Sequence, residues 1–182
     1  VYLTSNVLPK HYIVGTVDMK QTGKAYVIVE EGEDIYISHN NTNHALHGDK
    51  VKVYLFPQRK NRKREGQIIE VIERAKISFV GVLETHQRYA FVIPDSSFMP
   101  VDIFIPIDCV SSAKNGDKVL AEITEWPESA NNPFGKVIKV LGKPGDNDVE
   151  MQSILSEFDF PLFFPEQVEK EATEIPIQLS QS

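Results

Sequence analysis

The chain has 182 residues, of which 41% are hydrophobic and 25% charged, a balance that is ordinary for a globular protein of one or two domains. No apolar run reaches the roughly eighteen residues of a membrane span, no secretory leader opens the chain, and a single cysteine, Cys109, excludes an internal disulfide and a CxxC zinc site. We therefore expect a cytoplasmic protein without membrane contact.

The negative charge is concentrated in the C-terminal tail. The net charge is −7, and residues 146–182 hold nine acidic side chains against Lys170 alone, a balance of −8. Residues 1–145 therefore carry a net charge of +1. The overall charge is thus a poor guide to partners, although a body of +1 is weakly charged for a protein that binds phosphates.

The first part of the chain predicts a run of five β-strands. Residues 1–13 are assigned as a linker or arm, because Pro9 argues against a long strand there. β-Branched and aromatic residues bounded by polar turn signals then predict strands that begin at Tyr12 and cover residues 12–19, 25–30, 34–38, 50–56 and 65–74. A basic cluster at residues 59–64 precedes the last of them.

The same pattern recurs in the second part of the chain. The matching segments are GTV at 15–17 and GVL at 81–83, AYVIV at 25–29 and AFVIP at 90–94, DIYI at 34–37 and DIFI at 102–105, HGDKVKV at 47–53 and NGDKVLA at 115–121, and EGQIIEVI at 65–72 and FGKVIKVL at 134–141. Because the offsets stay between 65 and 69 residues, two copies of one five-stranded unit follow each other. Such a unit predicts a small Greek-key barrel of the OB type, with a five-stranded SH3-like barrel as the alternative.

One stretch of the second unit, residues 87–106, places aromatic rings outside the predicted core. Successive side chains of a strand point to opposite faces. One face is aliphatic and should line the core: Ala90, Val92, Ile103 and Ile105. The other face is aromatic: Tyr89, Phe91 and Phe104. Exposed rings on neighbouring strands form a platform on which unpaired bases stack, or they pack in a second buried face or against a protein partner.

After residue 145 the apolar pattern changes to a helical period. The apolar residues recur at helical spacing: Met151, Ile154, Leu155 and Phe158. Asn147 and Glu150 have the spacing of a capping box, which predicts one short amphipathic helix. Pro161 interrupts it, and a second helix with an acidic first turn is predicted from Pro165. We interpret the C-terminal end as a position within a longer protein.

Several motifs resemble those of a known family. DIFIP at 102–106 is followed by NGDKV, EITEWP, NPFGKVIKVLGKPGD and VEMQSILSEFDFPLFFPEQV, and the first unit contains DIYI, ALHGDKVKV and REGQIIEVIERA. In this order they resemble the tandem cold-shock domains of bacterial ribonuclease R enzymes, in the ribonuclease II (RNB) family, over residues 15 to about 172. The resemblance implies an all-β fold of two tandem five-stranded OB-fold (cold-shock) barrels, at residues 14–76 and 77–143, followed by a short helical tail at 144–182.

The resemblance also implies a function. Members of this family are processive hydrolytic 3′-to-5′ exoribonucleases that use Mg²⁺, and their cold-shock domains guide single-stranded RNA to a catalytic RNB domain. The cluster of closely spaced aspartates that holds Mg²⁺ in that domain is missing from this sequence, where the acidic residues after 145 are scattered. We therefore assign no catalytic or metal-binding residue, and we expect a monomer that binds single-stranded RNA without cleaving it or needing a cofactor.

The candidate RNA-binding residues follow from the repeat and the resemblance. The platform interpretation is favoured for Tyr89, Phe91 and Phe104, and the same hypothesis applies to Tyr26 and Tyr36 of the first unit. Lys24 stands where the second unit has Tyr89, so a cation replaces one stacking ring. The candidate phosphate contacts beside the rings are Lys24, His86 and Arg88.

The basic cluster contains five cations in six residues: Arg59, Lys60, Arg62, Lys63 and Arg64. It is either a solvated loop or a phosphate contact. His39, His44 and His47 lack the further ligands of a zinc site, and we expect Trp126 to pack between the second unit and the tail. The alternative functions are a standalone RNA chaperone or translation-type OB-fold protein, and a pair of barrels that docks another protein.

Overall fold

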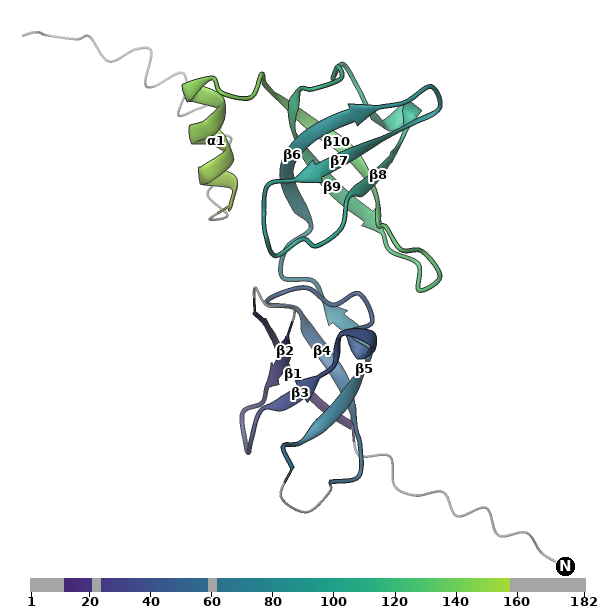
Figure 1. Ribbon diagram of the computed structural model, residues 1–182, viewed down its shortest axis with the longest axis vertical. Helices are drawn as coiled ribbons and strands as arrows, with labels where there is room; N and C mark the ends of the chain where they lie inside the picture. The colour runs from purple at the N-terminus through teal and green to yellow at the C-terminus, as the bar shows by residue number, and fades with distance from the viewer. Residues whose placement is uncertain (1–11, 21–23, 59–61, 158–182) are drawn as a thin grey trace, which may run out of the picture.

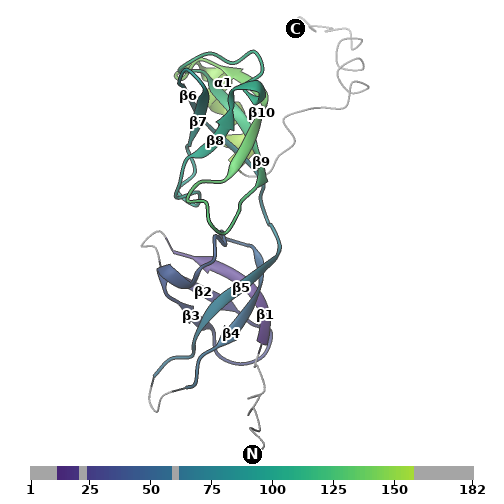
Figure 2. The same ribbon diagram turned by 90° about the vertical axis from the view of Figure 1, so that its right-hand side faces the viewer.

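The residues that the structure describes form two five-stranded barrels followed by one α-helix (Figures 1 and 2). The computed structural model describes residues 12–20, 24–58 and 62–157. The first barrel contains β1 (Tyr12–Met19), β2 (Ala25–Ile28), β3 (Ile35–Ile37), β4 (Lys50–Leu55) and β5 (Glu65–Glu73). The second contains β6 (Ser78–Thr85), β7 (Tyr89–Pro94), β8 (Ile103–Pro106), β9 (Lys118–Glu125) and β10 (Phe134–Gly142), and α1 (Asn147–Glu157) follows it.

Both barrels close with the same strand order. The order is β1-β2-β3-β5-β4 in the first barrel and β6-β7-β8-β10-β9 in the second, where β9 also pairs with β6. In each barrel the third and fifth strands are parallel and the other neighbours antiparallel. This is the Greek-key connectivity of the OB barrel, so the predicted repeat and the OB interpretation are confirmed, and the SH3-like alternative is wrong.

The first strand begins two residues before the predicted domain boundary at residue 14. The strand predicted from Tyr12 is confirmed, since Tyr12 pairs with Tyr54 and Ile13 with Val53 of β4, although the linker was drawn to residue 13. The strand therefore starts where its backbone finds a partner. Residues 1–11 lie outside the described residues.

Alternation along the strands builds one core inside each barrel. In the second barrel the four predicted core residues, Ala90, Val92, Ile103 and Ile105, are fully buried. Gly15 and Gly81 occupy matching positions where the chain passes very close to the next strand. A Cβ atom would lie 2.4 Å from the Ile28 carbonyl oxygen at Gly15 and 2.2 Å from the Ile93 carbonyl oxygen at Gly81. Glycine is needed at both places because any side chain would collide with backbone.

A buried aspartate fixes the turn that precedes the fourth strand of each barrel. Asp49 is fully buried, and its carboxylate accepts hydrogen bonds from the backbone N–H groups of Leu46 (2.8 Å) and Ala75 (2.9 Å) and from the Arg74 guanidinium (2.7 Å). Asp117 repeats the arrangement with the N–H of Lys114 (2.8 Å) and the ammonium of Lys143. The hydrogen bond from Lys143 lowers the pKa of the Asp117 carboxyl group below its ordinary value.

The loop between β3 and β4 of the first barrel packs against the second barrel. Leu46 from this loop is buried in the hydrophobic cluster of the second barrel. His47 stacks on Phe98 and His44 stacks on Trp126, each pair with ring centroids 4.6 Å apart. The expectation that Trp126 packs between the second barrel and the tail is therefore wrong: its ring covers the junction between the barrels.

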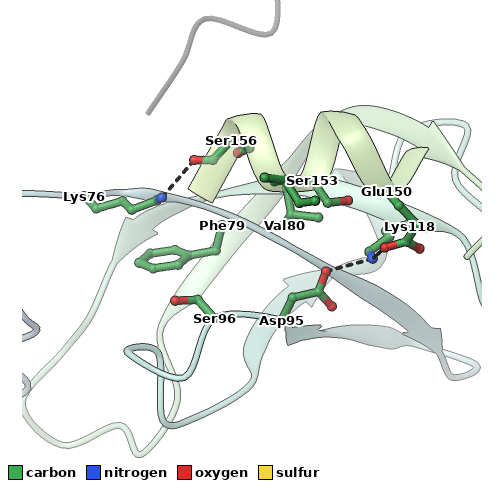
Figure 3. Close-up of a pocket in the computed structure, with 10 residues that line it drawn as sticks. Lys76, Phe79, Val80, Asp95, Ser96, Lys118, Glu150, Ser153 and Ser156 are labelled. Atoms are coloured by element: carbon green, nitrogen blue, oxygen red, sulfur yellow. Dashed lines mark hydrogen bonds and ion pairs between the residues drawn. The ribbon is translucent and has the colours of Figure 1, made fainter. Parts of the chain in front are cut away.

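Helix α1 packs on the second barrel beside β6 (Figures 1 and 3). The Lys76 ammonium donates to the Ser156 carbonyl at 2.9 Å. The buried Lys118 ammonium lies 3.0 Å from Asp95 and 2.9 Å from Glu150 (Figure 3). Burial opposes the charge of Lys118, but its hydrogen bonds to Glu150 and Asp95 outweigh that effect and raise its pKa. Polar contacts thus attach the helix to the barrel.

The helix does not bury the apolar stripe that its spacing predicts. Its buried residues are Val149, Ser153 and Ser156, whereas the stripe residues Met151, Ile154 and Leu155 are exposed. The helix is therefore confirmed, but it is oriented by its polar contacts and not by its apolar stripe. Phe158 and the predicted second helix from Pro165 lie outside the described residues. Within the described part of the chain, no helix combines the length and apolar character that crossing a membrane requires.

Candidate nucleic-acid interface

Three predicted rings form one cluster on the outer face of β7 and β8. Phe91 lies directly opposite Phe104 in the antiparallel pair, and their ring centroids are 5.7 Å apart. The Tyr89 ring lies 5.6 Å from Phe91 and 5.8 Å from Phe104. Such spacings are those of packed aromatic pairs. Because cross-strand neighbours share a face, the three rings make a continuous surface, which we call the platform.

A fourth ring, Phe134, extends the platform on β10. Phe134 is the parallel partner of Phe104, and the two ring centroids are 5.1 Å apart. Phe134 was not predicted, because it lies outside the hairpin at 87–106 that supplied the candidate rings. The start of the strand after Pro133 contained the necessary signal. Gly135 faces the core, so its neighbour Phe134 faces outward.

The platform is backed by the barrel core but remains accessible. Tyr89 is 38% exposed, and Phe91, Phe104 and Phe134 are half-buried. Behind the rings the same strands bury Ala90 and Ile105 in the core. The rings therefore present faces and edges to solvent from a fixed backbone, which is the arrangement that base stacking needs.

Of the two candidate phosphate contacts beside the platform, His86 is part of the ring cluster. Its imidazole lies 4.8 Å from Tyr89 and 6.5 Å from Phe91, centroid to centroid, and its Nε2 atom is 3.7 Å from a carboxylate oxygen of Glu84. Arg88 is exposed in the turn between β6 and β7. His86 and Arg88 thus both lie in the turn immediately before Tyr89, the first residue of β7.

The first barrel has a smaller aromatic face. Tyr26 on β2 lies opposite Tyr36 on β3, with ring centroids 5.6 Å apart. Lys24 is exposed immediately before β2, in the position of Tyr89. Glu65 is the parallel partner of Tyr36, as Phe134 is of Phe104. Two of the four platform positions are therefore charged in the first barrel.

The described part of the basic cluster lies between Tyr26 and a pocket beside Phe56, which Arg62 and Lys63 both line. The Lys63 ammonium lies 5.7 Å from the ring centroid of Tyr26, within range of a cation–π contact. Arg62 is exposed and lines a pocket that also includes Phe56. Arg64 is half-buried, and its carbonyl accepts a hydrogen bond from the Tyr36 N–H at 2.9 Å. Arg59 and Lys60 lie outside the described residues.

The geometry provides stacking surfaces with a few cations at their edges. Among residues 12–20, 24–58 and 62–157, no group of three or more His, Cys, Asp or Glu side chains is placed to hold a metal ion. His44 and His47 instead stack on aromatic rings at the junction. Adjacent exposed rings on a rigid sheet can bind planar, unpaired bases without reading their hydrogen-bonding edges.

Two parts of the chain match known domain families. Residues 15–71 match the ribonuclease B OB domain, and residues 91–165 match the cold shock domain. Ribonuclease R of Thermotoga maritima is 33% identical over 169 residues, which are 91% of this chain and 24% of the relative. Ribonuclease R of Escherichia coli is 29% identical over 160 residues, which are 87% of this chain and 20% of the relative. The chain therefore spans a quarter or less of these relatives.

Solved structures share the fold. RNase R of Mycoplasma genitalium in complex with ribose methylated single-stranded RNA has a TM-score of 0.78 at 17% identity, covering 92% of this chain and 27% of that chain. Yeast Ssd1, a pseudonuclease, has a TM-score of 0.68 at 21% identity, covering 82% of this chain and 25% of that chain. At such identities the likeness shows the fold alone and not the chemistry of the barrel surfaces.

Proposed function

Because this chain belongs to the ribonuclease R family as its OB and cold-shock region, we propose that it binds single-stranded RNA by stacking bases on the platform of the second barrel. The observation that carries the proposal is the cluster of four adjoining rings: Tyr89, Phe91, Phe104 and Phe134. Stacking is worth about 1–3 kcal/mol per base, which compensates for the weak charge of the body.

The role of the region in a longer protein is part of the proposal. The relatives are named ribonuclease R, and the solved neighbours from M. genitalium include complexes with single-stranded and with double-stranded RNA. We propose that the barrels deliver single-stranded RNA to a hydrolytic 3′-to-5′ exoribonuclease domain in the cytoplasm. The Mg²⁺ for that reaction would be held by the nuclease domain, because the platform offers rings and not carboxylates.

The test is a binding titration with a fluorescent single-stranded RNA. Replacing Tyr89, Phe91 and Phe104 together by alanine should weaken binding at least about tenfold, since the stacking energy of more than one base is lost. The control variant is Ile72→Ala/Ile138→Ala, which truncates two exposed apolar side chains outside the platform and should bind RNA as the wild type does. Circular dichroism checks that both variants are folded.

Two results would contradict the proposal. Unchanged RNA affinity in a folded triple variant would remove the platform from RNA binding and favour a surface that docks another protein. Shortening of a labelled RNA from its 3′ end by the purified chain with Mg²⁺ would show that this region cleaves RNA by itself. A standalone RNA chaperone is the weaker candidate, because the ribonuclease R relatives match this chain over most of its length.

A further inference from the structure

A second group of rings lies on β1 and β4 of the first barrel, separate from Tyr26 and Tyr36 on β2 and β3. Tyr12 of β1 lies directly opposite Tyr54 of β4, and their ring centroids are 6.1 Å apart. Phe56 follows β4, and its ring lies 6.1 Å from Tyr54 in an edge-on arrangement. Tyr12 is 39% exposed, and the other two rings are half-buried. We call these three residues the β1–β4 row.

The barrel fold does not require the row. The second barrel has the same strand order, and Ser78 pairs with Glu122 there as Tyr12 pairs with Tyr54 in the first barrel. The repeat places Thr124 at the position of Phe56. A barrel of the same connectivity therefore forms with serine, glutamate and threonine at these positions. Large outward rings that the fold does not need indicate a binding surface.

Cations flank the row at both ends. The Lys52 ammonium lies 5.2 Å from the centroid of the Tyr12 ring. At the other end, Phe56 lines a pocket together with Arg62 and Lys63, and one carboxylate, Glu65, lines it as well. Lys52 also lies 3.9 Å from a Glu70 carboxylate oxygen. The row therefore combines aromatic faces with three cations against two carboxylates, which fits a ligand that carries both planar groups and negative charge.

Lys63 links the row to the other aromatic face of the barrel. Its ammonium lies over the ring of Tyr26 and also lines the pocket beside Phe56. Tyr36 then pairs with Glu65, and the Phe56 N–H donates to the Glu65 carbonyl at 2.9 Å. One band of outward side chains thus runs around the barrel from β2 through β3 and β5 to β4 and β1.

We propose that the β1–β4 row is a second stacking site for single-stranded RNA, which extends the path of a longer strand around the first barrel. The inference rests on the proposed function, because it takes the ligand to be RNA. Bases stack on Tyr54 and Phe56, and phosphates between the row and Tyr26 meet Arg62 and Lys63. A short RNA that fills the platform of the second barrel does not need the row.

RNA length separates this site from the platform. The experiment measures the affinity of the full chain for fluorescent single-stranded RNAs of about 6 and about 20 nucleotides, since OB folds occupy about 4–16 nucleotides each. The variant Tyr54→Ala/Phe56→Ala should bind the longer RNA about fivefold or more weakly and the shorter RNA with less than a twofold change. The matched variant Glu122→Ala, which lies opposite Ser78 as Tyr54 lies opposite Tyr12, should bind both RNAs as the wild type does.

The outcomes are distinguishable. If the wild type binds neither RNA, the proposed function itself fails. If the wild type binds both and the folded double variant binds the longer RNA equally tightly, the row is cross-strand packing and this inference is overturned. Photocrosslinking of the wild type to a 4-thiouridine RNA provides a measurement that needs no variant. Crosslinks at Tyr54 or Phe56 support the row, and crosslinks confined to the second barrel contradict it.

Discussion

The two barrels share one strand order but present different outer faces. At the four equivalent positions the second barrel has Tyr89, Phe91, Phe104 and Phe134, and the first has Lys24, Tyr26, Tyr36 and Glu65. The glycine that lets the first strand pass its neighbour and the aspartate that fixes the turn before the fourth strand occur in both. The repeat therefore keeps what the barrel needs, and it varies where a ligand would be contacted.

The comparison suggests a division of labour between the barrels. The second barrel concentrates its rings on the β7, β8 and β10 face. The first has two rings on the corresponding face, a lysine over one of them, and the β1–β4 row on the other side of β5. We expect the second barrel to supply most of the affinity through stacking, and the first to follow the strand with rings and cations.

The largest expected difference concerns stability, at the buried turn aspartates. Asp49→Ala would leave Arg74 without its carboxylate and the N–H groups of Leu46 and Ala75 without their acceptor. We expect a loss of about 3–5 kcal/mol in the free energy of unfolding, the usual cost of breaking a buried charged pair. Urea denaturation followed by circular dichroism measures it.

Asp117→Ala is the matched change in the second barrel. It should cost less, because Asp117 accepts from one backbone N–H and its partner Lys143 is 66% exposed and can be solvated when the aspartate is gone. If the two alanine variants lost equal stability, the greater burial of the Asp49 site would have no energetic consequence.

The next effect concerns single rings at equivalent positions. Phe104→Ala removes the ring that contacts Tyr89, Phe91 and Phe134, and it should cost about 1–3 kcal/mol of RNA-binding free energy. Tyr36→Ala removes a ring with one aromatic neighbour and should cost less than half as much. Anisotropy titrations of the two variants with one RNA measure the ratio, and a greater loss for the first barrel would reverse the proposed division.

A gain of function would sharpen the comparison further. Lys24→Tyr with Glu65→Phe gives the first barrel the same four ring positions as the second. We expect RNA binding about threefold to tenfold tighter, because one additional base can stack and a carboxylate beside Tyr36 is removed. Glu65→Gln removes the charge without adding a ring, so it separates the two contributions. An unchanged affinity in the four-ring barrel would mean that its face does not meet RNA.

The salt dependence of binding should distinguish the two kinds of site. In single strands each neutralised phosphate contributes about −0.7 to the slope of log affinity against log salt. Arg62→Ala/Lys63→Ala should flatten this slope for a long RNA, and the platform triple variant should lower the affinity with little change in slope. Titrations at several salt concentrations measure both quantities, and equal slopes for wild type and the cation variant would leave the cluster as a solvated loop.

The sequence predicts the barrels well because a repeated alternation of apolar residues determines both strand and core. Each strand of the first unit is found within two residues of its predicted ends. The same alternation predicts that Tyr89, Phe91 and Phe104 share the outer face of the hairpin. Phe134 was missed because its contact with Phe104 arises from the parallel closure of the barrel, which joins residues 30 apart.

Contacts that depend on packing between units were harder to predict. Nothing in local spacing says that Trp126 stacks on His44, or that Tyr12 lies opposite Tyr54 on the neighbouring strand. The helix pattern predicted α1 correctly but not the side that it buries. Its orientation is set by Lys76 and Lys118, which reach it from the barrel.

The smallest expected effect is a pH dependence of the junction between the barrels, where His44 stacks on Trp126. Burial and the neighbouring Arg74 lower the pKa of His44 below its ordinary value, against an opposing effect of Glu128. The folded junction therefore favours neutral His44. Its contribution to the free energy of unfolding is complete above the unfolded pKa of about 6.5 and is lost as the pH falls through the lower folded pKa.

Trp126, the single tryptophan, stacks on this imidazole and reports its protonation by fluorescence. We expect its emission to change with an apparent pKa below about 6.5, and thermal stability to fall slightly over the same range. His44→Asn, which tolerates the left-handed backbone at φ 58°, should abolish the transition. A transition that persists in this variant would assign the titration to another group and leave the junction insensitive to pH.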